Sequence, residues 1–318
     1  MTINVGAIIP LREHATSFYR ADGPLSRLPK NKYNIIHKET LSWAQLSYLD
    51  IMFVQRPFVK EHLGACEMIK NNDVPLWLDY DDDVLSLGED NPHYWAYASP
   101  EAKESIIKML QMADIISVST PAMLEAYFPY NKNIVIIPNA HDDVWWPWTA
   151  TEPKEKTVIW RGSKTHSKDI ESWIGRLSQL SEKHPDWKWI FMGNGGWNLA
   201  EKIKNKESSM VLDIPNYFRF LRDTAPAINI FPLHDSPFNR SKSNCCWMET
   251  TYGGAVTFST ALPEYDRPGI QHLDDLDKFM TDPSLLKKEY IKSFDCIRDN
   301  LLLSNVNKIR EELIHSLL

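Results

Sequence analysis

Two polar loops in the second half of the chain have the composition of an anion-binding site. The first, residues 161–169, follows an apolar run at 157–160 and places Gly162, Ser163 and His166 ahead of a predicted helix. A glycine beside small hydroxyl residues lets backbone N–H groups approach an anion at a helix N-terminus, where Arg and Lys side chains add positive charge. The spacing is not that of a P-loop or a GxGxxG fingerprint. An ordinary strand-to-helix turn with a solvated basic rim is an equally weighted alternative.

The second polar loop, residues 232–244, leads into a helix predicted over 242–252. Lys242 and Ser243 at the start of that helix would form a second anion site. Glu249 follows Lys242 by seven residues, which on a helix places it on the same face and about 10 Å further along. A phosphate at one end and a hydroxylated ring at the other is the geometry of a nucleotide. A solvated helix carboxylate is the alternative interpretation of Glu249.

Four aspartates crowd the end of another apolar run, at 75–78. They are Asp79, Asp81, Asp82 and Asp83. Crowding raises the pKa of one carboxylate and helps it to accept a proton from a hydroxyl group, and clustered carboxylates can also coordinate a divalent cation. A solvated, capping loop is the structural alternative.

Basic residues gather near the N-terminus, where Arg12, Arg20 and Arg27 lie in or near predicted loops. Residues 1–60 hold eight Arg and Lys against four Asp and Glu, a net charge of +4. Residues 61–150 have a balance of −11, and the whole chain is at −7. The overall acidity argues against a protein whose whole surface binds nucleic acid. The local excess is either a plain solvated face or a surface that attracts a phosphate-bearing partner.

The elements that position these loops alternate between strand and helix. At a soft prior of ~150 residues per domain, 318 residues make about two domains, and the alternation pauses at 141–156. Strands are predicted at 4–10, 33–38, 50–56, 75–80, 114–119, 133–138, 157–160, 187–192, 209–214, 227–232 and 255–259. Helices are predicted at 41–48, 59–71, 100–112, 121–128, 168–183, 197–204, 217–223, 242–252 and in the tail, 284–318. The pattern predicts an α/β protein with two doubly wound, Rossmann-like domains, whose ligands bind at the carboxyl ends of the strands.

Several strings resemble the GT-B glycosyltransferases related to glycosyltransferase family 4. The resemblance runs in order from about residue 79 to 260. It is carried by Ala113-Asp114-x-x-x-Val118-Ser119-Thr120-Pro121, by Val135-x-x-Ile137-Pro138-Asn139, by Gly162-Ser163-x-Thr165-His166-x-x-Asp169, and by Asp235-x-x-Phe238-Asn239-x-x-Lys242-Ser243 with Glu249 and Gly253 beyond it.

The resemblance implies two domains that face a cleft. An acceptor-binding domain at 1–145 would precede a nucleotide-sugar-binding domain at 146–284, and a helical segment at 285–318 would cross back to the first domain. The implied reaction moves a sugar from a nucleoside diphosphate, UDP by analogy, to a hydroxyl acceptor, with retention of configuration and with neither a metal nor a further cofactor. Saccharide, lipid-phosphate and DNA acceptors all remain open.

Carried over residue by residue, the resemblance assigns roles to the loops. Glu249 would bind the donor ribose, and Tyr217 would lie near the nucleobase. Lys242, Ser243 and the Gly162–Ser163 loop would hold the diphosphate, assisted by Arg161 and His166. Asp169 belongs to the same donor-binding set. Asp81 or Asp82 would receive or orient the acceptor proton, and Arg12, Arg20 and Arg27 would bind the acceptor.

One departure from the family concerns its usual pair of glutamates eight positions apart, because the first would fall on Ser241. Asp235 or Asn239 would then supply the sugar contacts. Three alternatives stay open. The first is a DNA glycosyltransferase of the bacteriophage type that modifies hydroxymethylated bases. The second is a metal-dependent GT-A transferase using Asp81 and Asp83. The third is an inactive sugar-nucleotide-binding module.

No window approaches the ~20 consecutive apolar residues of a membrane span. The first ten residues lack the basic start and cleavage site of a signal peptide. We therefore expect a cytoplasmic protein, bacterial or, if encoded by a phage, in the host cytoplasm.

Overall fold

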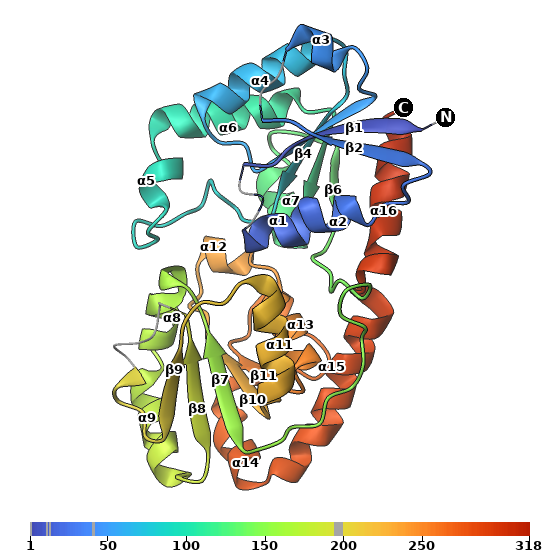
Figure 1. The fold of residues 1–318 in the computed structure, drawn as a ribbon. Coiled ribbons are helices and arrows are strands. Elements are labelled where there is room, and N and C mark those ends of the chain that lie inside the picture. The colour runs from blue at the N-terminus through green and yellow to red at the C-terminus, as the bar shows by residue number, and fades with distance from the viewer. Residues whose placement is uncertain (1, 11, 13, 40–41, 194–199) are drawn as a thin grey trace. The chain divides into compact units, whose positions relative to one another are not determined.

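The chain folds into two compact units in the computed structural model (Figure 1), which describes residues 2–10, 12, 14–39, 42–193 and 200–318. The first unit comprises Met1–Val144, Ser241–Ser243 and Leu301–Leu318. The second comprises Trp145–Arg240 and Asn244–Asn300. Three residues from the middle of the second half of the sequence therefore belong to the first unit.

The first unit is built on a six-stranded parallel sheet with the order β2-β1-β3-β4-β5-β6. Alternate residues of one strand enter two different cores, because successive side chains point to opposite faces. Ile51 and Phe53 pack on one face, and Met52 and Val54 on the other. The strands are β1 (Ile3–Ile8), β2 (Tyr33–His37), β3 (Ile51–Gln55), β4 (Leu76–Tyr80), β5 (Ile115–Val118) and β6 (Ile134–Ile136).

Helices cover both faces of this sheet. On one face lie α2 and the last helix, α16, which runs along the sheet in red in Figure 1. On the other face lie α3, α4, α6 and α7. The helices of the unit are α1 (Ala15–Arg20), α2 (Asp22–Ser26), α3 (Trp43–Leu46), α4 (Lys60–Lys70), α5 (Tyr94–Tyr97), α6 (Pro100–Met112), α7 (Pro121–Tyr127) and α16 (Leu303–Ser316).

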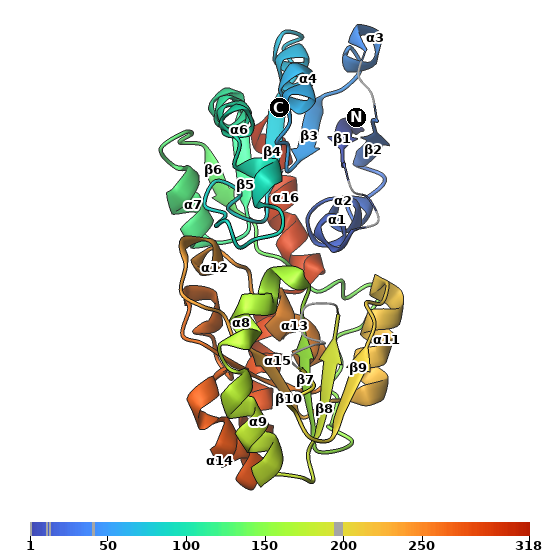
Figure 2. The ribbon, with the colours of Figure 1, turned by 90° about the vertical axis from the view of Figure 1, so that its left-hand side faces the viewer.

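The second unit repeats the design with the parallel order β12-β11-β10-β7-β8-β9. Figure 2 shows α8 and α9 on one side of this sheet and α11 on the other. Its strands are β7 (Thr157–Arg161), β8 (Lys188–Met192), β9 (Lys206–Ser209), β10 (Ile228–Phe231), β11 (Val256–Ser259) and β12 (Gln271–His272). Its helices are α8 (Ser167–Glu171), α9 (Ile174–Lys183), α11 (Ile214–Thr224), α12 (Pro237–Arg240), α13 (Cys245–Tyr252), α14 (Leu276–Thr281) and α15 (Leu286–Asn300).

The strand order of the second sheet reverses between β7 and β10. In open parallel sheets this switch point opens a crevice at the carboxyl ends of the strands, because the connections leave to opposite sides. The loops that follow β7 and β10 are the two polar loops of the sequence, 161–169 and 232–244. The topology therefore places both at the position where such sheets bind ligands.

The predicted α/β fold class is confirmed, and most predicted strands are present within one or two residues. The strand predicted at 209–214 is wrong, because the edge strand is Lys206–Ser209 and Ile214 begins α11 after the Asp213 cap. The helix predicted at 168–183 breaks into α8 and α9. The predicted helix at 197–204 begins in residues that lie outside the described part of the chain.

The C-terminal stretch is helical, as predicted, and its two long helices belong to different units. α15 packs in the core of the second unit, through Leu286 and Tyr290. α16 packs against the first sheet through Leu303, Val306 and Ile314. Among the described residues, no helix combines the length and apolarity needed to cross a membrane.

Candidate functional site

The loop after β7 is shaped by a close approach of two backbones. The Gly162 N–H donates to the carbonyl of Met192 at 3.0 Å. Gly193 has φ +96°, and a Cβ placed there would lie 2.3 Å from the Gly162 oxygen. Only glycine fits this position without displacing the neighbouring loop. Beyond Gly162, the Ser163 hydroxyl accepts from the Thr165 N–H at 3.3 Å and starts a short 3₁₀ turn.

Asp169 is the buried centre of a polar cluster that joins this loop to the one after β10. It is 1% exposed. Its carboxylate pairs with His166 Nδ1 at 2.9 Å and accepts from the His234 N–H and from Asn239 Nδ2, both at 2.9 Å. Burial raises the pKa of Asp169, but the hydrogen bonds from His166 and His234 outweigh it and leave the pKa below its ordinary value. The cluster fixes the two loops against each other.

Glu249 lies on α13, 4% exposed, among three groups from separate elements. Arg161, the last residue of β7, forms an ion pair with it. The Tyr217 hydroxyl, from α11, donates to Glu249 Oε2 at 2.9 Å. Burial and the Glu249 charge raise the pKa of Tyr217. The predicted donor residues Arg161, Tyr217 and Glu249 are therefore direct neighbours, on the carboxyl side of the second sheet.

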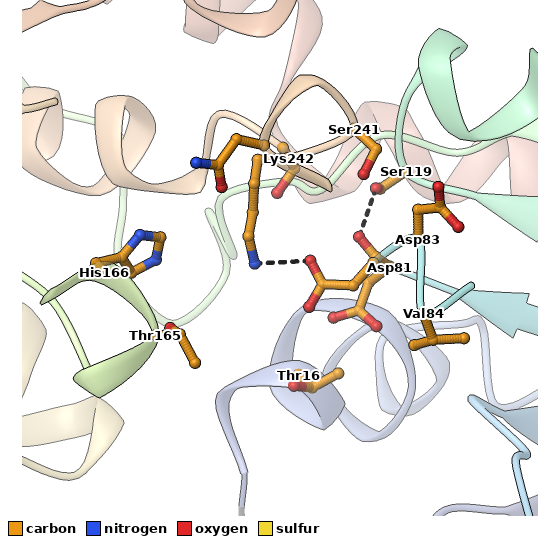
Figure 3. A network of polar contacts seen from close by, with 12 residues as sticks. Thr16, Asp81, Asp83, Val84, Ser119, Thr165, His166, Ser241 and Lys242 are labelled. Carbon is orange, nitrogen blue, oxygen red and sulfur yellow. Dashed lines mark hydrogen bonds and ion pairs between the residues drawn. The ribbon is translucent and has the colours of Figure 1, made fainter. Parts of the chain in front are cut away.

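Lys242 and Ser243 are not on the helix that carries Glu249, so the prediction of one shared helical face is wrong. α13 begins at Cys245, after the Asn244 cap. The preceding Ser241–Ser243 segment packs in the first unit instead. Lys242 Nζ donates to Asp82 Oδ1 at 2.8 Å. In Figure 3 the Lys242 side chain extends toward the aspartates at the end of β4, and a dashed line marks its bond. Long-range contacts, invisible in the local sequence, determine this placement.

Asp81 and Asp82 share one cationic partner, Arg56, which was not among the predicted site residues. Arg56, directly after β3, donates from Nε to Asp81 Oδ1 at 2.7 Å and from Nη2 to Asp82 Oδ2 at 2.9 Å. Its backbone has φ +41°, a conformation that non-glycine residues rarely adopt. The pKa of Asp81 is raised, as predicted, although burial rather than the neighbouring Asp82 is the largest cause.

The other two aspartates of the cluster point elsewhere. Asp79 is 1% exposed and forms a bidentate pair with Arg20, at 3.0 and 2.7 Å. Asp83 accepts from the Leu85 N–H at 3.2 Å and so caps its own turn. Among the described residues, no group of three His, Cys, Asp or Glu side chains is arranged to hold a metal ion.

The three arginines predicted to bind the acceptor do not form one surface. Arg20 is fully buried, with Asp79 and Asn139 as partners, so its prediction as an acceptor-binding residue is wrong. Arg12 forms an exposed ion pair with Asp22 at 3.1 Å. Arg27 pairs with the buried Asp142 at 3.0 Å. Each arginine is thus matched by a carboxylate.

The two residues predicted to replace the missing glutamate differ in their surroundings. Asp235 is 59% exposed and forms a bidentate pair with Arg240. Asn239 is 4% exposed and belongs to the Asp169 cluster. Of the two, Asn239 is the one built into the loop pair at the switch point.

No protein-family model matches the sequence, and no curated protein matches it by sequence. Several solved structures share the fold. HepE of Anabaena, solved with UDP and glucose, is 10% identical over 99% of this chain and 100% of its own, with a TM-score of 0.69. An alpha-glucosyltransferase solved with UDP and a 13-mer DNA containing a HMU base is 11% identical over 99% of this chain and 100% of its own, with a TM-score of 0.68.

A third structure matches over a part of its length. The pneumococcal O-GlcNAc transferase GtfA, solved with UDP and GlcNAc, is 14% identical over 86% of this chain, with a TM-score of 0.57. This chain spans 59% of that enzyme. Structural matches at such low sequence identity show the fold alone. Two parallel, doubly wound units and the full-length structural matches overturn the GT-A alternative, and the chain has the GT-B fold.

Proposed function

We propose that the protein is a glycosyltransferase that moves a sugar from a nucleoside-diphosphate sugar to a hydroxyl group of an acceptor. The observation that carries the proposal is the cluster of Arg161, Tyr217 and Glu249 at the switch point of the second sheet. A buried carboxylate beside an arginine and a phenol offers hydrogen-bonding groups for a ribose and charge for a phosphate. UDP is the nucleotide bound in the three similar structures.

On this proposal the donor residues have distinct roles. Glu249 binds the ribose, and Tyr217 lies near the base. Gly162 and Ser163 hold the diphosphate together with Lys242 and Ser243. The Asp169 cluster holds the Gly162 loop and the 232–244 loop against each other. Asn239, a member of this cluster, contacts the sugar. Arg161 and His166 support the negative charge that develops on the departing diphosphate.

The acceptor half supplies the proton acceptor. Asp81 and Asp82 are held by Arg56 at the end of β4. Either carboxylate is a candidate base: burial raises the pKa of Asp81, and Asp82 pairs with Lys242 of the proposed diphosphate site. We further propose retention of configuration, as the family resemblance implies. We also propose catalysis without a metal, since lysine and backbone amides suffice to neutralise the leaving group.

Labelled UDP-sugars test the proposal directly. The protein should bind UDP and should release it from at least one UDP-sugar, and a chelator should leave the rate unchanged. Turnover that is abolished by chelator would contradict the metal-free mechanism. UDP binding without turnover of a UDP-sugar, whichever acceptor is added, would favour the inactive binding module.

The acceptor class has two candidates. A neutral saccharide fits the first unit, because Arg12, Arg20 and Arg27 are each neutralised by a carboxylate. DNA is favoured by one observation, the end-to-end match to the DNA-bound alpha-glucosyltransferase. Transfer of label to duplex DNA containing hydroxymethylated bases would establish the second candidate. Transfer to sugars without transfer to that duplex would support the first.

A further inference from the structure

The Ser241–Ser243 segment bonds to the first unit at three points, each after a different strand. The Ser241 carbonyl accepts from the Thr120 hydroxyl, after β5, at 3.0 Å. Lys242 pairs with Asp82, after β4, and the Ser243 hydroxyl accepts from Asn139, after β6, at 2.8 Å. The chain on both sides of the segment belongs to the second unit. A candidate donor-binding segment is therefore held by the candidate acceptor unit.

The central contact of this segment is a partly shielded ion pair. The Lys242 and Asp82 side chains are 17% and 22% exposed, and Nζ lies 2.8 Å from Oδ1. The other Asp82 oxygen, Oδ2, is bonded by Arg56 at 2.9 Å. Each oxygen of Asp82 thus has a cationic partner. An ion pair with this shielding is stronger than one in open solvent, because the surrounding water screens it less.

A donor diphosphate and Asp82 compete for the same ammonium group, if Lys242 binds the diphosphate as proposed above. We propose that Asp82 is the residue that couples donor binding to acceptor activation: it holds Lys242 when no donor is bound, and the donor diphosphate takes Lys242 away from it. This inference rests on the proposed function. Both roles of Asp82, as restraint and as base, use the same atom, Oδ1.

The exchange prepares Asp82 for the transfer step. Arg56 keeps Oδ2 in place while Oδ1 loses its bond to Lys242. The acceptor O–H bond then breaks and its proton passes to Oδ1, while the acceptor oxygen bonds to the anomeric carbon on the face from which the diphosphate leaves, as retention of configuration requires. The bond from that carbon to the diphosphate oxygen breaks, and the diphosphate leaves with the electron pair onto Lys242. The base is thus released only when a leaving group is in place to receive the lysine.

Loss of the Asp82 carboxylate should strengthen nucleotide binding. Asp82→Asn removes a competitor for Lys242, so UDP should bind about threefold to tenfold more tightly, while sugar transfer falls. Calorimetric titration with UDP measures the affinity. Asp114→Asn is the matched control, because it breaks another Lys–Asp pair of the same unit, with Lys70 at 2.6 Å. It should leave UDP affinity and transfer unchanged.

A double-mutant cycle separates this competition from a general charge effect. In a Lys242→Ala background, Asp82→Asn should no longer change UDP affinity. Thermal melting confirms that each variant is folded, and Asp82→Ser repeats the test with a different side chain. Unchanged or weaker UDP binding by both Asp82 variants overturns the inference, as does equal tightening without Lys242. Failure of the wild-type protein to bind any nucleoside diphosphate overturns the proposed function instead.

Discussion

Arg161 and Glu249 form an ion pair that joins the end of β7 to the middle of α13 inside the second unit. The Tyr217 hydroxyl completes the contact at 2.9 Å. Removing the Glu249 charge would leave a largely buried guanidinium without its carboxylate, so the pair has a structural as well as a binding role.

Glu249→Gln should weaken UDP binding about tenfold to a hundredfold, because a hydrogen bond to a charged group contributes roughly 1.5–3 kcal/mol. Calorimetry measures the loss. Glu289→Gln is the control, since Glu289 is a mostly buried glutamate of the same unit that pairs with Lys292 at 2.8 Å. It should bind UDP as the wild type does. Equal affinity of the Glu249 variant and the wild type would refute the assignment of the ribose site.

Asp169→Asn should lower the free energy of unfolding at pH 7 by about 2 kcal/mol, because a buried charge that accepts several hydrogen bonds is lost. The folded-state pKa of Asp169 lies below its ordinary value of 3.8. Its stabilising contribution is therefore present above that value and is lost as the pH falls through the folded pKa. Urea unfolding should show a gap between the two proteins that is constant near neutrality and shrinks below about pH 4. A gap that widens with acid would contradict the hydrogen-bond network.

Gly193→Ala should destabilise the protein by about 1–3 kcal/mol, because it forces a left-handed backbone on alanine and drives its Cβ into the Gly162 carbonyl. UDP affinity should fall with it, since the Gly162 loop must shift. Gly175→Ala is the control: it lies on α9 with no heavy atom within 4 Å of the added Cβ. Denaturation should place that variant at or slightly above wild-type stability. Equal effects of both substitutions would argue against the close approach of the two loops.

The cysteines should differ sharply in reactivity. Cys66 and Cys246 are buried, and burial raises their pKa to about 12 and about 11. Cys245 and Cys296 are half-buried. A thiol reagent at pH 8 should therefore modify Cys245 and Cys296 in the native protein before the other two, which react on unfolding. Peptide mapping by mass spectrometry identifies the sites. Rapid modification of Cys66 in the folded protein would contradict the core around α4.

The core strands were predictable because they are continuous apolar runs buried on both faces. β9 was misplaced because it is not such a run. Its residues, Lys206–Ser209, are polar and largely exposed. The apolar residues that follow them belong to a loop and to the start of α11. Ser99 and Thr120 do cap α6 and α7 ahead of a proline, as local sequence rules predict.

The sequence indicated the two polar loops after β7 and β10, but not the partners of the residues in them. Asp169 reaches His234 because β7 and β10 are neighbours in the second sheet. The βαβ alternation indicated a parallel sheet but not this strand order. The burial of Arg20 by Asp79 does not follow, because the two residues are distant in sequence and nothing local distinguishes Arg20 from Arg12. The attachment of Lys242 to Asp82 was missed for the same reason. The unusual backbone of Arg56 has no sequence signature either.

The most direct test of the central claim is turnover of labelled UDP-glucose and UDP-N-acetylglucosamine by the purified protein, with Glu249→Gln alongside. We expect the wild-type protein to release UDP from at least one of these donors, faster when a hydroxyl acceptor is present, and the Glu249 variant to lose most of this activity. Absence of UDP binding and of UDP release by the folded wild-type protein would contradict it.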